Sequence, residues 1–389
     1  MKRILFLRDK GLCYDSLNGF RQLLGEALTE AGHSVSYASP DELENYIGLC
    51  DMVIGFNIQT NIKDSHGVYL YDSFGVPVVD FIVDHPYMHH QALSAKLRQL
   101  YVLCLDDNHV SYIKRCYPHI AGVYRTFLTG RRAEYVPAYE KRRYEVLFSG
   151  SYADEQKILE GISQLGDVVA GVCYDVIQYL LDNPNQTEEF AFDKVLAKSG
   201  VEMNREEYAA FLHFAMPSVD YFFRNYYRHV LITDLVEAGL PVTVCGNGWS
   251  ELSCAANPNL TILPPVSFEQ TFSMIADSKI LLNIMPWFKA GLHDRIFTAM
   301  LNETVCVTDT SDVIERLFTN HRELVSFPLI EKDVLPQLVR ELLENPRRAE
   351  EIARQGFAKA KEQFGAREIA NTVLQVFADR EKGECDGIS

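Results

Sequence analysis

The chain has 389 residues, of which 47% are apolar and 23% are charged, and its formal net charge is -16 at pH 7. This length exceeds what one hydrophobic core usually supports, so we expect a globular protein with two domains. The acidic charge argues against nucleic acid as a partner and against binding to an anionic membrane through a basic surface.

The nine cysteines are scattered and form no C-x-x-C pair and no Cys/His cluster with zinc spacing. Several of them, such as Cys104, Cys245 and Cys306, lie inside apolar runs, where cysteine behaves as a small apolar residue. The apolar run at the basic N-terminus is too short for a signal peptide, and no run reaches the ~20 residues of a membrane span. We therefore expect a cytoplasmic protein with no transmembrane segment and no metal site.

The first part of the chain alternates short apolar strands with helical stretches, which predicts a parallel, doubly wound sheet. The pattern lapses near Thr129, so we place the interdomain linker there and assign residues 1–137 to the first domain. The predicted strands cover residues 4–7, 35–38, 52–56, 76–83 and 101–105, and the helical stretches cover 17–28, 42–47, 66–74, 91–99 and 110–117.

Residues 138–365 are predicted to form a second α/β domain. A stretch at about 167–227 has helical character without a strand, so we expect a helical insert there. A last helix at about 366–380 can pack back on the first domain, and residues 381–389 are predicted to be a frayed tail. The predicted strands are 144–148, 241–245, 260–263, 279–288 and 304–308, and helices are predicted near 153 and at 224–238, 270–276, 293–302 and 334–342.

Three polar loops directly follow strands of the second domain. They begin at Ser149, at Gly246 and at Ala290, after the strand that contains Asn283, and the last one leads into a helix that begins at His293. Ligands bind at the carboxyl ends of parallel strands, where backbone N–H groups and helix starts can hold a phosphate. Glycine is also common in ordinary strand-to-helix turns, so each loop alone is as readily structural as functional. No P-loop or dinucleotide-binding fingerprint is present.

The order of these motifs resembles group 1 glycosyltransferases, with the closest similarity to the spore-maturation-protein (CgeB-like) branch. The resemblance extends from about Phe148 to the C-terminus, and Asp84-His85-Pro86 is similar to the N-terminal domain of that branch more loosely. The motifs that carry it are Gly239-Leu-Pro-Val-Thr-Val-Cys-Gly-Asn-Gly-Trp249, Pro265-Val-Ser-Phe-Glu269, Leu282-Asn283 with Pro286, and Gly291-Leu-His-Asp-Arg-Ile-Phe297.

The resemblance implies a GT-B fold, with two Rossmann-like domains facing across a cleft. It also implies metal-independent transfer of a sugar from a nucleotide-diphosphate sugar, linked to UDP or GDP, to an unidentified acceptor. The acidic charge favours a soluble or protein acceptor over a phospholipid surface. Arg295 is the cation expected to neutralise the departing diphosphate, with Lys289 as its substitute. The implied donor-binding residues are Ser149, Gly150, Gly246, Asn247, Gly248, Trp249, Phe268, Asn283, Gly291, Leu292, His293, Asp294 and Arg295.

Asp84 and His85 follow an apolar strand of the first domain and are the predicted catalytic groups there. In an inverting enzyme either one would serve as the base for the acceptor hydroxyl. In retaining relatives, a histidine of this domain contacts the sugar and the leaving phosphate takes the proton. The sequence leaves both outcomes open.

Thr298 departs from the family pattern, because retaining relatives carry a glutamate at that position. The basic residues that relatives place after the first strand of the donor domain are also missing, and Arg224 or Arg228 are alternative donor contacts. Two other interpretations therefore remain. One is a catalytically degenerate GT-B protein that binds a partner. The other is a nucleotide-sugar epimerase, which has the same fold and more paired carboxylates.

Overall fold

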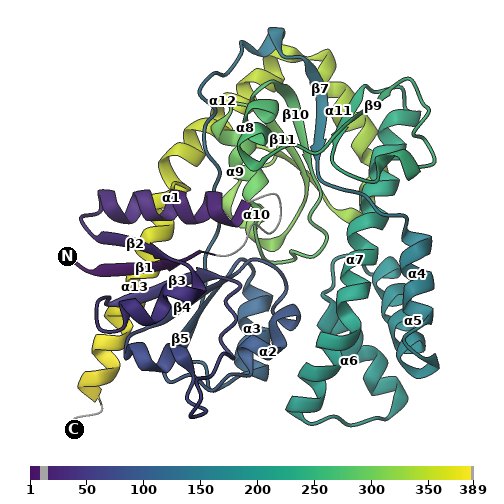
Figure 1. Cartoon of the computed structure of the whole chain (residues 1–389). Coiled ribbons are helices and arrows are strands. Elements are labelled where there is room, and N and C mark those ends of the chain that lie inside the picture. The colour runs from purple at the N-terminus through teal and green to yellow at the C-terminus, as the bar shows by residue number, and fades with distance from the viewer. Residues whose placement is uncertain (9–15, 387–389) are drawn as a thin grey trace. The chain divides into compact units, whose positions relative to one another are not determined.

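The computed structural model describes residues 1–8 and 16–386, with side chains as far as Ala378 (Figure 1). The chain divides into an N-terminal unit, Met1–Thr129 with Gln363–Ser389, and a C-terminal unit, Gly130–Glu362. Residue 137, where the sequence places the end of the first domain, lies inside the C-terminal unit.

The N-terminal unit is built on a six-stranded parallel sheet with the order β2-β1-β3-β4-β5-β6. The three central strands β3, β4 and β5 are buried along their whole length, as expected for continuous apolar runs covered on both faces. Strand β6 was not predicted, because it has only four residues, three of them half-buried. The strands are β1 Arg3–Leu7, β2 Ser34–Ala38, β3 Met52–Phe56, β4 Val78–Ile82, β5 Leu100–Cys104 and β6 Gly122–Arg125.

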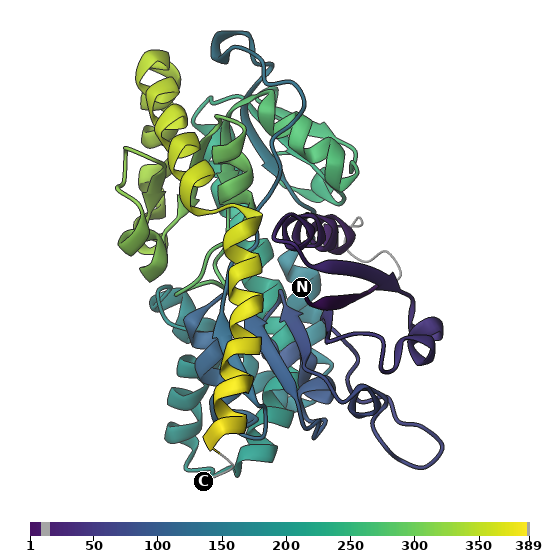
Figure 2. The same ribbon diagram turned by 90° about the vertical axis from the view of Figure 1, so that its left-hand side faces the viewer.

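The helices of this unit include the C-terminal one, α13, which packs against α1 and extends to Asp386 (Figure 2). The prediction of a frayed tail from residue 381 is therefore wrong as far as residue 386. Helical stretches predicted at 42–47, 66–74 and 91–99 are only short helices or turns. In the second of these, the Asp64 carboxylate accepts from the N–H groups of His66 and Val68, which forms a turn instead of a helix. The helices are α1 Ser16–Glu30, η2 Pro40–Tyr46, η3 Leu70–Phe74, η4 Pro86–His89, α2 His90–Leu93, α3 Asp107–Cys116 and α13 Ala366–Asp386.

The C-terminal unit is built on a second six-stranded parallel sheet, with the order β12-β11-β10-β7-β8-β9. The prediction of two doubly wound parallel α/β sheets is thus confirmed. Strand β10 ends at Asn283 and not at residue 288, because Pro286 has no N–H group and the N–H of Met285 donates to the Asp309 carboxylate. The strands are β7 Tyr144–Ser149, β8 Val242–Cys245, β9 Leu260–Leu263, β10 Ser278–Asn283, β11 Val305–Asp309 and the unpredicted β12 Val325–Phe327.

The helical insert consists of α5 and α6 and continues into α7, with α4 packed beside α7 (Figure 1). The prediction that a separate helix begins at Arg224 is wrong. Helix α7 begins at Arg205 and runs for 33 residues, because Asn204 and Glu207 form a capping box at its start and the chain continues through Pro217. The helices are α4 Glu155–Ser163, α5 Asp167–Asp182, α6 Glu188–Ser199, α7 Arg205–Glu237, α8 Phe268–Ala276, α9 Asp294–Leu301, α10 Asp312–Leu317, α11 Leu335–Glu344 and α12 Pro346–Gln363, with short turns η5 Tyr139–Lys141, η6 Trp249–Glu251 and η7 Leu329–Val334.

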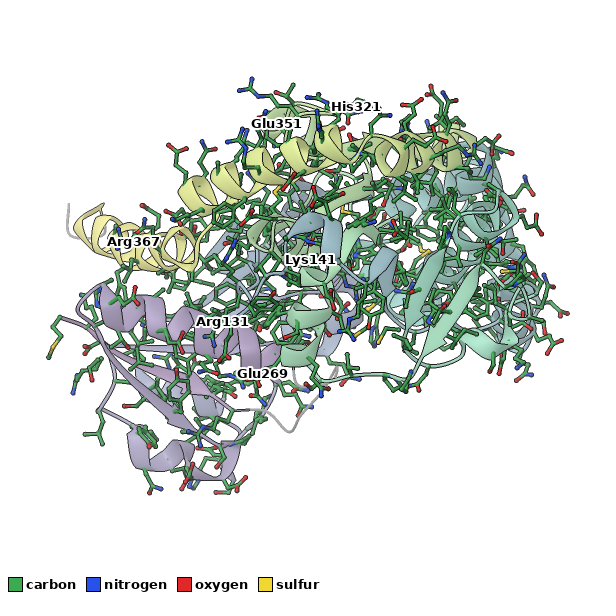
Figure 3. All side chains as sticks on the ribbon, turned by 90° about the horizontal axis from the view of Figure 1, so that it is seen from above. Arg131, Lys141, Glu269, His321, Glu351 and Arg367 are labelled. Carbon is green, nitrogen blue, oxygen red and sulfur yellow. The ribbon has the colours of Figure 1, made fainter. Side chains whose placement is uncertain are left out.

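The segment 130–142 leads into β7 and lies along the C-terminal end of α9; Figure 3 labels Arg131 and Lys141 within it. The buried Arg142 donates hydrogen bonds to the carbonyl oxygens of Ser278, Asn302 and Glu303. These carbonyls include the ones that the end of a helix leaves unsatisfied. The segment is therefore fixed to the same helix whose other end begins at the predicted site.

Candidate functional site

Three loops of the C-terminal unit leave the carboxyl ends of strands that are neighbours in the sheet. Strands β10, β7 and β8 are adjacent, so the loops after Asn283, Ser149 and Cys245 share one edge. Ser149 and Gly150 are half-buried there, whereas Asn247 is exposed. Phe268 lies further along, where α8 begins after the edge strand β9, and packs edge-to-face on Phe272.

The β7 and β8 loops hold each other through backbone hydrogen bonds. The N–H of Gly150 donates to the Cys245 carbonyl at 2.9 Å, and the N–H of Tyr152 donates to the Asn247 carbonyl at 2.8 Å. A Cβ atom on Gly246 would overlap the Gly150 carbonyl oxygen, and one on Gly248 would overlap that of Tyr152. Glycine is therefore required at 246 and 248 for the two loops to pack this closely.

Trp249 is fully buried beneath these loops. Its Nε1 donates to the Gly150 carbonyl at 2.7 Å, and its ring stacks on Tyr152 with a centroid distance of 5.5 Å. Phe148 meets the indole edge-to-face, also at 5.5 Å. Because the indole has no exposed surface, Trp249 acts through the position of the loop that it supports.

Two arginines from different elements meet at the ring of Phe148. The guanidinium carbon of Arg228, from α7, lies 5.8 Å from the ring centroid, and that of Arg295, from α9, lies 6.0 Å from it. Arg228 also donates to the Ser151 carbonyl at 2.6 Å. Arg224, one turn earlier on α7, donates to Asp220 at 2.6 Å and lies over the ring of Trp287. Helix α7 thus brings two cations to the edge where Arg295 lies.

These cations are held at a cost in electrostatic energy. Burial, together with the charges of Arg295 and Arg224, lowers the pKa of Arg228 to about 9. Burial and Arg224 also lower the pKa of Arg295, and Asp294 opposes that shift. Within the described part of the chain, Arg228 Nε and Arg295 Nη1 are buried and have no hydrogen-bond partner. Unpartnered buried donors of like charge mark a place where an anion would be stabilised.

His293 caps the N-terminus of α9, which was predicted to begin at this residue. Its Nδ1 accepts from the N–H of Arg295 at 3.3 Å. Burial, followed by the charges of Arg295, Arg224 and Arg228, holds the pKa of His293 well below its usual value. The low pKa favours the neutral imidazole, and its Nδ1 also lies 3.2 Å from Asp294 Oδ1. Burial raises the pKa of the neighbouring Asp294.

Asn283 is fully buried at the end of β10. Its Nδ2 donates to Thr308 Oγ1 at 3.0 Å, and its Oδ1 has no hydrogen-bond partner among the described residues. On the next strand, the Asp309 carboxylate accepts from the N–H of Met285 at 2.7 Å, and burial raises its pKa to about 6. These two polar groups fix the point where the loop leaves the sheet.

The remainder of the loop after β10 is also anchored. The Gly291 carbonyl accepts from Ser311 Oγ at 2.7 Å, and Leu292 is buried. The ammonium group of Lys289, considered above as a substitute for Arg295, donates to the carbonyl of Pro184 in the helical insert. Trp287 and Asp220 were not predicted as part of this region. An aromatic residue directly after Pro286 at a strand end was the available signal for Trp287.

Thr298, which the resemblance places where retaining relatives have a glutamate, faces the segment before β7. It is 2% exposed and donates to the Asp294 carbonyl at 3.1 Å. A Cβ atom on Gly130 would overlap its Oγ1. The Thr298 side chain is therefore buried and packs directly against residue 130.

Asp84 and His85 belong to the N-terminal unit, at the end of β4. His85 is 5% exposed, and its Nδ1 accepts from the N–H of Tyr87 at 3.2 Å. Its ring stacks on Tyr87 with a centroid distance of 3.8 Å and meets His109 at 4.4 Å. Asp84 is half-buried. The His85 imidazole is thus held in a fixed orientation by an aromatic cluster.

No group of three or more His, Cys, Asp or Glu residues is placed to hold a metal ion in the described part of the chain. The cysteines whose side chains are described are buried and form no disulfide with one another, namely Cys50, Cys104, Cys116, Cys173, Cys245, Cys254 and Cys306. Across residues 1–8 and 16–386, none of the helices combines the length and the apolar character that a membrane span requires.

Residues 228–375 match a protein-family model described as "Glycosyl transferase-like". No curated protein sequence matches the chain. The structural comparisons cover nearly the whole molecule. Sucrose-phosphate synthase from Thermosynechococcus elongatus has a TM-score of 0.55 and 9% identity, over 98% of this chain and 100% of that one.

HepE from Anabaena, in complex with UDP-glucose, has a TM-score of 0.53 and 11% identity over 97% of this chain and 100% of that one. An alpha-glucosyltransferase in complex with UDP-glucose and DNA has a TM-score of 0.55 and 12% identity, over 96% and 99% of the two chains. These similarities show that the fold is that of the GT-B glycosyltransferases. Similarity to the CgeB-like branch stays a prediction.

Proposed function

We propose that this protein is a glycosyltransferase that moves a sugar from a nucleotide-diphosphate sugar to an acceptor without a metal ion. The observation that supports this most strongly is the pair Arg228 and Arg295, whose buried nitrogen atoms lack partners at the carboxyl edge of the sheet. A diphosphate supplies both the charge and the acceptor oxygens that these groups need. The glycosyltransferase-like match, which begins at Arg228, supports the same function.

In the proposed reaction, the bond between the anomeric carbon and the diphosphate oxygen breaks, and negative charge develops on that oxygen. Arg295 stabilises this charge together with the positive end of the α9 helix dipole. Arg228 and Arg224 bind the other diphosphate oxygens. Because these cations are fixed before the donor binds, little reorganisation is needed in the transition state.

The sugar is proposed to lie against the loop after β10. The neutral His293 imidazole is proposed to form a hydrogen bond with a sugar hydroxyl or a phosphate oxygen. The glycines of the Ser149–Gly150 and Gly246–Gly248 loops let the phosphates approach the backbone closely, and Trp249 keeps those loops in place. We propose UDP-glucose as the first donor to test, because two structures with this fold contain it.

The acceptor hydroxyl must lose its proton as the glycosidic bond forms. We propose His85 or Asp84 as the base if the enzyme inverts the anomeric configuration. If it retains the configuration, the leaving diphosphate takes the proton and His85 contacts the sugar. The net acidic charge favours a soluble or protein acceptor over an anionic lipid surface.

A second candidate is a GT-B protein that binds a nucleotide or a partner without catalysis. The observation in its favour is the packing of Thr298 against Gly130, which leaves no space for the glutamate of retaining relatives. Binding without turnover would distinguish this candidate from the enzyme.

The deciding experiment is calorimetric titration with UDP-glucose, GDP-glucose, UDP and GDP, followed by an assay for release of the nucleoside diphosphate. Arg295→Ala should lower turnover with the preferred donor by about 2 to 4 kcal/mol in transition-state free energy. Arg354→Ala is the matched control, because Arg354 is exposed and pairs only with Glu351 on α12. Unchanged turnover in Arg295→Ala would contradict the diphosphate assignment, and failure of every nucleotide to bind would contradict the function itself.

A further inference from the structure

Trp287 lies at the point where the loop after β10 meets the helical insert. Its half-buried indole carries the guanidinium group of Arg224 at 3.9 Å from the ring centroid. Asp220, one turn earlier on α7, accepts from Arg224 Nε at 2.6 Å. The Arg224 side chain is 17% exposed and is thus held between a carboxylate and an aromatic face.

The same indole also touches the start of α9. Its ring meets the His293 ring edge-to-face with a centroid distance of 5.8 Å. Trp287 therefore connects a cation of α7 with the residue that caps the helix carrying Arg295. Two residues further along, Lys289 forms a second connection to the insert through the Pro184 carbonyl, in the turn between α5 and α6. The loop after β10 is attached to the helical insert at both points.

We propose that Trp287 is a positioning residue for the donor diphosphate, and that the helical insert is a working part of the donor site through the Trp287–Arg224 contact. This inference rests on the proposed function, because it assigns a ligand of the nucleoside-diphosphate class to the same edge. The indole holds Arg224 over the loop so that its charge adds to those of Arg228 and Arg295.

The physical reason lies in the freedom of a long side chain. Arginine loses rotational freedom when it binds an anion, and a planar aromatic face that orients the guanidinium group beforehand removes part of that loss. The contact also shields one face of the guanidinium group from water, which strengthens its attraction to a phosphate. Removing the indole should therefore weaken binding of the diphosphate while the chemical step keeps Arg295.

The chain offers a direct spectroscopic test, because its only other tryptophan, Trp249, is buried away from solvent. Titration of the wild type with UDP should change tryptophan fluorescence, and Trp287→Phe should abolish that change. Trp287→Leu, which keeps an apolar side chain without an aromatic face, should weaken UDP about tenfold by calorimetry, and Trp287→Phe should weaken it less. With a sugar donor, KM should rise in Trp287→Leu with a much smaller fall in kcat.

Arg224→Gln combined with Trp287→Leu should bind UDP no more weakly than Arg224→Gln alone, because the indole acts through that arginine. Phe214→Leu is the control, since Phe214 is an exposed aromatic residue on the same helix. The inference is overturned, and the proposed function stands, if the wild type binds UDP and Trp287→Leu binds it equally well. The same conclusion follows if the losses of UDP affinity caused by Arg224→Gln and by Trp287→Leu add in the double variant. If calorimetry detects no nucleotide bound to the wild type, the proposed function fails, and the inference fails with it. Trp287→Phe carries the test if Trp287→Leu does not fold.

Discussion

Gly130 packs so closely on Thr298 that a Cβ atom at residue 130 would overlap Thr298 Oγ1 and lie 3.0 Å from the Cα atom of Thr298. The two residues are far apart in sequence, yet each determines what the other can be. A small side chain at residue 298 suits this contact, because residue 130 approaches it so closely.

The first prediction concerns this contact. Gly130→Ala should lower the free energy of unfolding by about 1 to 3 kcal/mol, because it forces extra volume into a packed site. Thr298→Glu should destabilise the protein more strongly, because it buries an unpaired carboxylate in a site that has no space for it. Thr298→Val should cost only about 1 kcal/mol for the lost hydrogen bond to Asp294. Chemical denaturation measures all three, and a stable Thr298→Glu variant would contradict the packing described here.

The second prediction compares two glycines with left-handed backbone conformations. Gly248 has φ of 83° and Gly239 has φ of 80°. An added Cβ atom on Gly239 would have no neighbour within 4 Å. Gly239→Ala should therefore lower the free energy of unfolding only through backbone strain, by about 1 kcal/mol. Gly248→Ala adds an overlap with the Tyr152 carbonyl and should lower the melting temperature further and weaken nucleotide binding. Equal melting temperatures for the two variants would show that the loops can separate at little cost.

The third prediction follows from the buried Asp309. Its pKa is raised from 3.8 to about 6, so the folded protein favours the protonated carboxyl. The stabilisation from this group is therefore complete below about pH 4 and is lost as the pH rises through about 6. Asp309→Asn keeps an oxygen acceptor for the N–H of Met285 and removes the titration. The free energy of unfolding of Asp309→Asn, relative to that of the wild type, should rise by on the order of 1 to 2 kcal/mol between pH 4 and pH 7. Urea denaturation at several pH values measures this difference, and a constant difference would contradict it.

The fourth prediction uses an anion in place of the donor. Inorganic diphosphate should raise the melting temperature of the wild type, because binding to the folded state at 100 times the dissociation constant stabilises it by about 2.7 kcal/mol. Inorganic diphosphate should raise the melting temperature of the Arg228→Gln variant much less. The unliganded variant should lose little stability, since burial and two neighbouring cations already disfavour the charge of Arg228. Arg143→Gln, which changes an exposed arginine paired with Asp277, should respond like the wild type. A full response in Arg228→Gln would remove this residue from the anion site.

The sequence predicts most strands of both sheets because long apolar runs are unambiguous. Strands β3, β5 and β11 appear within one or two residues of the predicted positions. Strands β6 and β12 were missed because three or four residues carry too little pattern. The start of α7 was misplaced because the apolar residues of the insert run on into those of the following helix, so the pattern contains no clear boundary between them.

For the site, the sequence predicts which loops share an edge, because strand ends follow directly from the strand pattern. It does not reveal that Trp249 is buried, since a tryptophan in a glycine loop has the same sequence pattern in either role. The meeting of Arg228 with Arg295 depends on how α7 lies along the sheet. Such contacts arise from tertiary packing between residues far apart in the chain.

The continuity of α7 limits how this protein can be shortened. At about 1.5 Å per residue, its 33 residues form a single rod about 50 Å long that starts in the insert and ends just before β8. A deletion of residues 167–227, the insert as the sequence delimits it, would remove Arg224 and leave Arg228 at a frayed helix end. A minimal version should instead join α4 to the chain just before Asn204, so that the helix keeps its capping box and the side chains of Asp220, Arg224 and Arg228.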